Sequence, residues 1–226
     1  MSDAMDAAAE QLGDREAYVE GDRRCTFAEW IAASDALAAD LVERGVRPGD
    51  VVALMLPPSI DYAVAYAGAV RAGAVATGLN TRLGPREVEA VLERCEPAVV
   101  VRDESLGLPP VRTPSAVLPR SAMADLAGGL GLGPDRPTRA PGDPVTIIWT
   151  SGTTGLPKGA WFDHRCLEAA VATAGVMTAP FDRRLVPTPF AHAGYMAKLW
   201  EQLAWGVTVV ISPPPWTADD TIRLIA

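Results

Sequence analysis

Cysteine and histidine are scarce in this chain of 226 residues. It has three cysteines, Cys25, Cys95 and Cys166, without C-x-x-C spacing, and two histidines, His164 and His192. Such a set supplies neither a disulfide framework nor the clustered ligands of a zinc site. We therefore expect no metal-ligating residue in the chain, and a reducing compartment.

Long uninterrupted apolar runs are also missing. The most apolar stretch, residues 62–79, is rich in Ala and Gly and contains Arg71, so it falls short of the roughly 18 clean apolar residues of a membrane span. The first residues are acidic, whereas a secretory signal begins with basic residues. These features predict a cytoplasmic protein without a membrane span.

Positive charge is in deficit, because 28 acidic side chains face 20 basic ones and the formal net charge is −8. An acidic protein repels nucleic-acid backbones and anionic lipid headgroups at long range, so neither is expected as a partner. An anionic ligand would need a local binding device. Hydrophobic residues make up 49% of the chain, and its length allows one large domain or two small ones with a sizeable core.

Helical and strand patterns alternate along the sequence. A short helix and a hairpin around residues 20–22 come first, and helices near residues 27–44, 59–72 and 85–95 then alternate with strands at 51–56, 74–77 and 98–101. Thr26 with Glu29 has the spacing of a capping box, and Ser59 and Pro85 are further helix-start signals. This alternation predicts an α/β fold with a mostly parallel sheet flanked by helices.

The chain is predicted to consist of three consecutive segments within residues 1–226. Residues 1–102 form a first α/β segment, residues 103–144 a loop-rich excursion with at most one or two helical turns, and residues 145–226 a second α/β segment. The apolar strand at 207–211 is expected to lack covering elements. Exposed sheet edges would also allow a homo-oligomer.

One segment concentrates the residues of an anion-binding loop. The strand at residues 145–149 is followed by Thr150, Ser151, Gly152, Thr153, Thr154, Gly155, Leu156, Pro157, Lys158 and Gly159. Glycines let backbone N–H groups turn toward a ligand, hydroxyls add donors, and Lys158 adds a positive charge. The spacing is not that of a Walker A loop. The segment predicts a polyphosphate-binding loop, with a Ser/Thr-rich turn between two strands as the alternative.

With these residues, the sequence resembles the adenylate-forming (AMP-binding) enzymes, which include acyl-CoA and aryl-CoA synthetases, luciferase and the adenylation domains of peptide synthetases. Residues 149–159 match the family's phosphate loop. Residues 79–83 also match, although Gly78 replaces the family's preceding proline, and residues 163–165 are similar to a further family segment. Asp163 is also explained as the N-cap of a following helix.

The resemblance implies a ligase that joins a fatty or aromatic acid to coenzyme A through an acyl-adenylate, using ATP and Mg²⁺. It assigns phosphate binding to Thr150, Ser151, Gly152, Thr153, Thr154, Gly155 and Lys158. It places His192 beside the acyl pocket, where the ring would help to position the substrate carboxylate or gate the channel. The alternative for His192 is a loop histidine that bonds its own neighbours.

The resemblance covers only the family's amino-terminal part. The family's adenine-binding and ribose-binding segments and its small C-terminal domain have no counterpart in this sequence, and a helix starting near Thr217 has no stop signal. We therefore expect an amino-terminal fragment that is inactive alone and whose partner is the missing C-terminal half. The alternative is a non-catalytic module of the same origin that binds a nucleotide or a protein partner.

Overall fold

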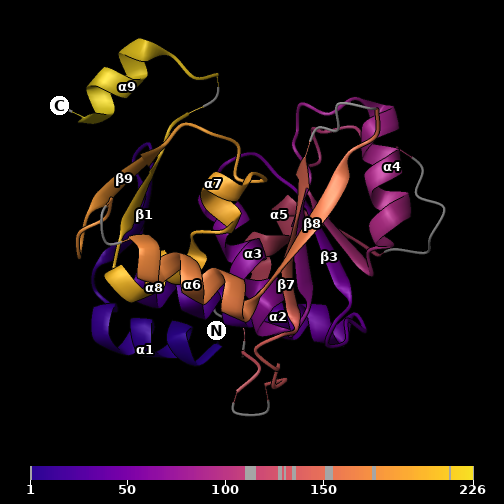
Figure 1. Ribbon diagram of the computed structural model, residues 1–226, viewed down its shortest axis with the longest axis horizontal. Coiled ribbons are helices and arrows are strands. Elements are labelled where there is room, and N and C mark those ends of the chain that lie inside the picture. Colours follow the sequence, from indigo (N-terminus) through magenta and orange to yellow (C-terminus); the bar gives the residue numbers. More distant parts are fainter. Residues whose placement is uncertain are drawn as a thin grey trace.

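The computed structural model describes residues 2–109, 116–126, 129, 131–133, 136–150, 155–174, 177–213 and 215–225. Within these ranges, two β-sheets are surrounded by helices (Figure 1). The predicted α/β class with a mostly parallel sheet is confirmed.

The larger sheet has six strands and carries the predicted polyphosphate loop at one edge. Its strands are β3 (Val51–Met55), β4 (Val75–Gly78), β5 (Val99–Arg102), β6 (Ala116–Pro119), β7 (Pro144–Thr150) and β8 (Lys158–Asp163). They lie in the order β6-β5-β3-β4-β7-β8, and all neighbours are parallel except β7 and β8. The loop after β7 therefore connects the two strands of an antiparallel hairpin.

The smaller sheet joins the two ends of the chain. Its strands are β1 (Glu16–Glu20), β2 (Arg23–Thr26), β9 (Arg183–Val186) and β10 (Thr208–Ile211), in the order β2-β1-β10-β9. The predicted hairpin of β1 and β2 is confirmed. The expectation that residues 207–211 lack cover is wrong, because β10 lies between β1 and β9, and Val209 and Ile211 are at most 3% exposed within the core.

Nine α-helices lie in the described residues, and those that local signals predicted begin and end close to these signals. The nine are α1 (Ser2–Leu12), α2 (Phe27–Glu43), α3 (Ile60–Arg71), α4 (Pro85–Cys95), α5 (Arg120–Met123), α6 (His164–Ala174), α7 (Ala193–Met196), α8 (Leu199–Trp205) and α9 (Ala218–Ile225). Thr26 and Glu29 form the capping box of α2, and Ser59 caps α3. Gly73 has a φ of +74°, as the turn after α3 requires. No helix in the described part of the chain is both long and apolar enough to cross a bilayer.

Residues 103–144 contain more regular structure than their composition predicts. β6 pairs in parallel with β5, and α5 is followed by a 3₁₀ turn at Ala124–Leu126. A four-residue strand that ends in Pro119 is tolerated because it lies at a sheet edge, where the missing N–H breaks no ladder. The division of the chain into three segments stays a prediction.

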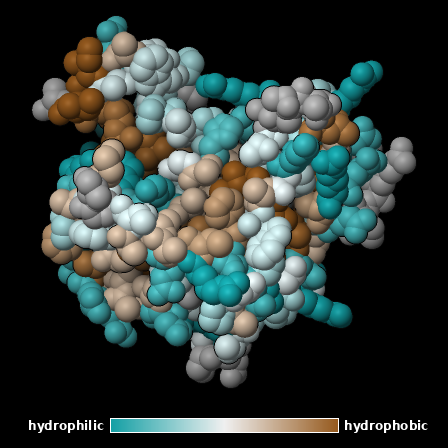
Figure 2. Space-filling view, viewed as in Figure 1, coloured by the Kyte–Doolittle hydropathy of each residue, from teal (hydrophilic) through white to brown (hydrophobic). Residues whose placement is uncertain are grey.

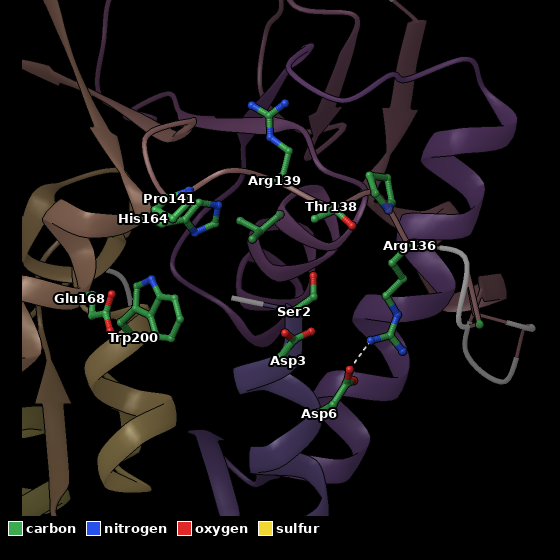
Figure 3. A pocket seen from close by; sticks show the side chains of 13 residues that line it. Ser2, Asp3, Asp6, Arg136, Thr138, Arg139, Pro141, His164, Glu168 and Trp200 are labelled. Carbon is green, nitrogen blue, oxygen red and sulfur yellow. Dashed lines mark hydrogen bonds and ion pairs between the residues drawn. The ribbon is translucent and has the colours of Figure 1, made fainter.

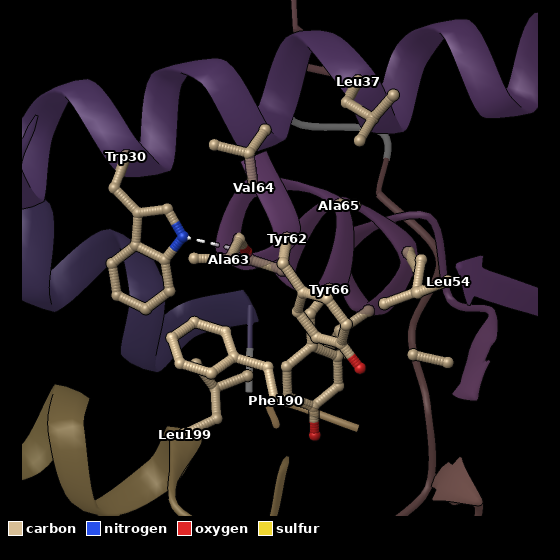
Figure 4. Close-up of a cluster of buried hydrophobic side chains, with 14 of the residues drawn as sticks. Trp30, Leu37, Leu54, Tyr62, Ala63, Val64, Ala65, Tyr66, Phe190 and Leu199 are labelled. Carbon is tan, nitrogen blue, oxygen red and sulfur yellow. Dashed lines mark hydrogen bonds between the residues drawn. The ribbon is translucent and has the colours of Figure 1, made fainter. Parts of the chain in front are cut away.

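The main hydrophobic core connects the two halves of the sequence. Figure 4 shows side chains of α2 and α3 meeting Phe190 and Leu199, which come from the second half. The indole Nε1 of Trp30 donates to the carbonyl of Ala63 at 3.1 Å and so joins α2 to α3. Apolar side chains also remain on the surface, and in α9 Ile222 and Ile225 are 65% and 72% exposed. Hydrophobic residues accordingly colour the surface over α9, at the upper left of Figure 2.

The start of α6 makes a pH-dependent contribution to stability. Asp163 Oδ1 accepts the backbone N–H of Cys166 at 2.8 Å, so the predicted N-cap is confirmed. The hydrogen bond from Arg165, followed by that from Cys166, lowers the pKa of Asp163 from 3.8 to about 2. The ionised carboxylate is the form that folding favours. Its contribution is therefore present above pH 3.8 and is lost as the pH falls through about 2.

We expect Asp163→Asn to flatten the acid-induced decline in the free energy of unfolding over this pH window, because asparagine keeps the cap but does not titrate. Urea unfolding at a series of pH values measures the slope. Asp163→Ala loses both the cap and the charge, so it should be less stable than Asp163→Asn at neutral pH as well. An unchanged acid slope in Asp163→Asn would contradict the assignment.

Candidate functional site

The carboxyl ends of β4 and β7 border a small cavity of about 190 Å³. Its walls come from the turn after β4, the beginning of α4, the β7–β8 hairpin and the segment before α7. Asn80, Thr150 and His192 are among its lining residues. Ligands of parallel α/β sheets commonly bind at this edge, so the cavity is the candidate site.

Three of the residues predicted for the phosphate loop are described. Thr150 and Lys158 face each other in the β7–β8 register, and the Thr150 hydroxyl donates to the Lys158 carbonyl at 3.3 Å. Gly155 has a φ of +122°, which L side chains rarely adopt. The remaining predicted residues lie outside the described part of the chain and are Ser151, Gly152, Thr153 and Thr154.

Lys158 is exposed at the first position of β8, and its ammonium has no ion-pair partner among the described residues. It lines a second cavity, of about 460 Å³, together with Arg94, Trp149 and Trp161. The structure thus places Lys158 beside the cavity of Thr150 and His192 but not in its wall. Arg94 of α4 donates to the Pro157 carbonyl at 2.7 Å and holds this end of the loop, a role for which its sequence position gave no signal.

Trp149 fixes β7 against β4 by a hydrogen bond. Its indole Nε1 donates to the hydroxyl oxygen of Thr77 at 2.7 Å, and the Thr77 hydroxyl donates to the Ile147 carbonyl at 3.0 Å. Trp149 lines both cavities. The sequence motif contained Trp149, whereas nothing in the sequence pointed to Thr77.

His192 occupies the N-cap position of α7, where its side chain makes no capping hydrogen bond. Its carbonyl accepts the N–H groups of Tyr195 and Met196, both at 3.0 Å. The half-buried ring instead contacts Asn80, whose Nδ2 lies 3.3 Å from His192 Nε2. The ring partner is therefore distant in sequence, unlike the neighbour-bonded loop histidine of the alternative interpretation.

Buried aromatic side chains anchor the residues on either side of His192 to the hydrophobic core. Phe190 stacks on Tyr195 with ring centroids 3.6 Å apart, and the Tyr195 hydroxyl lies 2.8 Å from that of Tyr18. Tyr18 in turn donates to Gln202 Oε1 at 2.8 Å. Burial raises the pKa of Tyr195 well above its ordinary value, so this network stays neutral. The His192 segment is thus anchored to the core.

Gly78 allows this segment to approach β4 closely. A Cβ atom at position 78 would lie 2.3 Å from the Tyr62 hydroxyl and 2.7 Å from the Ala191 Cα. Real Cβ atoms essentially never come so close, so a side chain here would push Ala191, and with it the neighbouring His192, away from the cavity.

We expect Gly78→Ala to lower the free energy of unfolding by about 1–3 kcal/mol, because overpacking forces side chains and backbone to shift. Urea unfolding measures this loss. Combining it with Tyr62→Phe, which removes the closest atom, should recover part of the loss. A free energy of unfolding that Gly78→Ala leaves unchanged would contradict the close packing of Tyr62 and Ala191 against position 78.

A larger cavity of about 550 Å³ lies between α1, residues 136–141, α6 and α8 (Figure 3). None of the described site candidates lines it. Its wall carries Asp3, Asp6 and Glu168, and Asp6 forms an ion pair with Arg136. The same wall carries Arg136 and Arg139, so its charges are mixed. No group of three or more His, Cys, Asp or Glu side chains in the described ranges could hold a metal ion.

Comparison with known proteins gives a consistent set of relatives. The family model described as AMP-binding enzyme matches residues 5–226. Long-chain-fatty-acid–CoA ligase FadD13 of Mycobacterium tuberculosis is 31% identical over 227 residues, covering 93% of this chain and 44% of the relative. A second relative, from Rhodococcus jostii, is 34% identical over 258 residues, covers 99% and 48%, and is named 3-[(3aS,4S,7aS)-7a-methyl-1,5-dioxo-octahydro-1H-inden-4-yl]propanoyl:CoA ligase.

The solved structures agree with these sequence relatives. The Mycobacterium tuberculosis fatty acyl CoA synthetase superposes with a TM-score of 0.86 at 26% identity, covering 100% of this chain and 47% of that chain. The chain therefore spans about half the length of the relatives that it matches.

Proposed function

This chain belongs to the AMP-binding enzyme family, and on that basis we propose that it forms the phosphate-binding and acyl-binding side of an ATP-dependent carboxylate–CoA ligase. The substrate is a fatty or aromatic acid. The names of the relatives as CoA ligases support the reaction class. The observation that carries the proposal is that Thr150 and His192, identified from separate sequence segments, line one cavity.

In the proposed reaction, a carboxylate oxygen of the acid attacks the α-phosphorus of ATP, the bond to the bridging oxygen breaks, and pyrophosphate leaves. The thiol of coenzyme A then releases its proton to solvent, its sulfur attacks the acyl carbon, the bond from that carbon to the phosphate oxygen breaks, and AMP leaves. Such transfers need accurate positioning and neutralisation of the charge that develops on the phosphates, rather than a covalent protein nucleophile.

We assign the β- and γ-phosphates to the loop that runs from Thr150 to Lys158. The exposed Lys158 ammonium, without an ion-pair partner among the described residues, supplies the positive charge. The Thr150 hydroxyl must release its 3.3 Å hydrogen bond to the Lys158 carbonyl before it can donate to a phosphate oxygen. The loop members between them are Ser151, Gly152, Thr153, Thr154 and Gly155, whose backbone and hydroxyl groups would add donors.

The described residues that line the cavity give no ligand set for Mg²⁺. The carboxylate in its wall, Glu87, accepts the Gly84 N–H at 2.9 Å as part of the α4 cap. We therefore assign none of the described residues to the metal. A magnesium ion carried by the triphosphate would offset its negative charge.

Release of pyrophosphate with ATP, coenzyme A and a panel of carboxylic acids tests the proposal. The assay compares this chain alone with a chimaera, in which the Mycobacterium tuberculosis synthetase supplies the part of its length that this chain does not match. Acid-dependent turnover by the chimaera alone would support the proposal, including our expectation that this chain is not competent by itself. ATP binding by a folded chimaera without turnover would favour the non-catalytic nucleotide-binding module instead.

A further inference from the structure

The hydrogen bonds of Asn80 fix the orientation of its side-chain amide. Asn80 lies in the turn between β4 and α4, and its Oδ1 accepts the backbone N–H of Arg82 at 3.0 Å. A backbone N–H can only donate, so the amide oxygen must face Arg82 and the amide NH₂ must face the other way. On that side lies His192 Nε2, at 3.3 Å from Asn80 Nδ2.

The amide orientation in turn sets the protonation of the imidazole. The NH₂ group of Asn80 only donates, so His192 Nε2 must accept through its lone pair, and the ring proton must reside on Nδ1.

We propose that Asn80 is a positioning residue that holds His192 as the neutral Nδ1–H tautomer, so that this N–H donates to the carboxylate of the acid substrate. The inference rests on the proposed function. A carboxylate is a pure acceptor, so it would be repelled by a ring nitrogen that carried a lone pair. Asparagine is suited to this position because it orients the ring without placing a negative charge beside the incoming acid.

Asn80→Asp keeps the acceptor of the turn, removes the donor to His192 and adds a negative charge. A carboxylate oxygen still accepts the Arg82 N–H, but nothing at position 80 then donates to His192, and the proton is drawn to Nε2. Asn80→Ala removes the donor without adding charge. The chain has only two histidines, so a long-range ¹H–¹⁵N spectrum contains two rings, and His164→Gln identifies the signals of His192.

The unmodified chain should show His192 protonated at Nδ1 and unprotonated at Nε2. Asn80→Asp should show a protonated Nε2, and Asn80→Ala a mixture of the two tautomers. Backbone amide spectra of the three proteins establish that each is folded. A protonated Nε2 in the folded unmodified chain, or an unchanged tautomer in folded Asn80→Asp, would overturn the proposal.

The kinetic test uses the chimaera. We expect Asn80→Asp to raise the KM for the carboxylic acid by about 10- to 100-fold, through the lost N–H donor and the added negative charge together. Asn80→Ala should raise this KM less, through the lost donor alone, and neither variant should change the KM for ATP. Active chimaera with an unchanged acid KM in Asn80→Asp would overturn the proposal but not the ligase function. Absence of all turnover would overturn the ligase function and the carboxylate role together, whereas the tautomer would still be decided by the spectra.

Discussion

Lys158→Ala in the chimaeric ligase should lower kcat/KM for ATP by about 10- to 100-fold, because loss of a hydrogen bond to a charged group costs about 1.5–3 kcal/mol. The exposed Lys158 side chain has no ion-pair partner among the described residues. Its substitution should therefore not lower the free energy of unfolding through a lost ion pair with any of them. A pyrophosphate-release assay at varied ATP concentration measures the change. The free energy of unfolding should stay within about 0.5 kcal/mol of the starting protein, as for other surface substitutions.

Two further variants sharpen this test. Lys158→Arg keeps the positive charge and should retain more activity than Lys158→Ala, although the planar guanidinium cannot reproduce the point charge of an ammonium. Thr154→Ala removes one hydroxyl donor of the same loop and should also weaken the use of ATP. Unchanged ATP kinetics in both Lys158→Ala and Thr154→Ala would mean that the segment is a structural turn of the hairpin.

The elements that could be predicted from the sequence are those with local signals. The capping box of Thr26 and Glu29, the cap at Ser59 and the left-handed glycine at position 73 involve contacts within a few residues, and each is present in the structure. Local signals also place the buried strands β3, β4 and β5, because continuous apolar runs fit strands that are covered on both faces.

Pairing between distant strands was not predictable in the same way. β1 pairs with β10 from the other end of the chain, so the second sheet follows from tertiary packing rather than from periodicity. β9 begins with Arg183 and Arg184, charged residues that do not suggest a strand, yet it completes that sheet by pairing with β10. Because the sequence did not predict that β10 lies between β1 and β9, this strand was wrongly expected to lack covering elements.

The candidate site likewise combines residues that sequence motifs predicted with contacts that only the folded structure shows. Thr150 and Lys158 come from a compact motif and His192 from a family resemblance, and the structure brings Thr150 and His192 to one cavity. Asn80 lay in a matching segment but had no assigned role, because its contact with His192 joins residues far apart in sequence. Trp149 likewise belonged to the motif, whereas its hydrogen bond to Thr77 is visible only in the folded chain.

Arg71→Ala is expected to produce the largest loss of stability, about 2–5 kcal/mol, because it removes a fully buried side chain together with its hydrogen bonds to two carboxylates, although Arg136 still pairs with both. The Arg71 side chain is 1% exposed, and its Nε and Nη2 donate to Asp35 at 2.8 Å and Asp6 at 3.0 Å. These bonds join the end of α3 to α2 and α1. Typical domains have about 5–15 kcal/mol of stability, so urea unfolding should show a large shift of the midpoint.

Arg44→Ala is a matched control, because Arg44 also bonds an aspartate, Asp40, at 2.6 Å, but its side chain is 36% exposed. Solvent screens that pair, so the loss there should stay below about 1 kcal/mol. Equal losses in the two variants would show that burial adds nothing to the Arg71 pair. Neither arginine lines the cavity of Asn80 and His192. Turnover of the chimaera per folded molecule should therefore be unchanged in both, which separates the stability of the fold from the chemistry of the site.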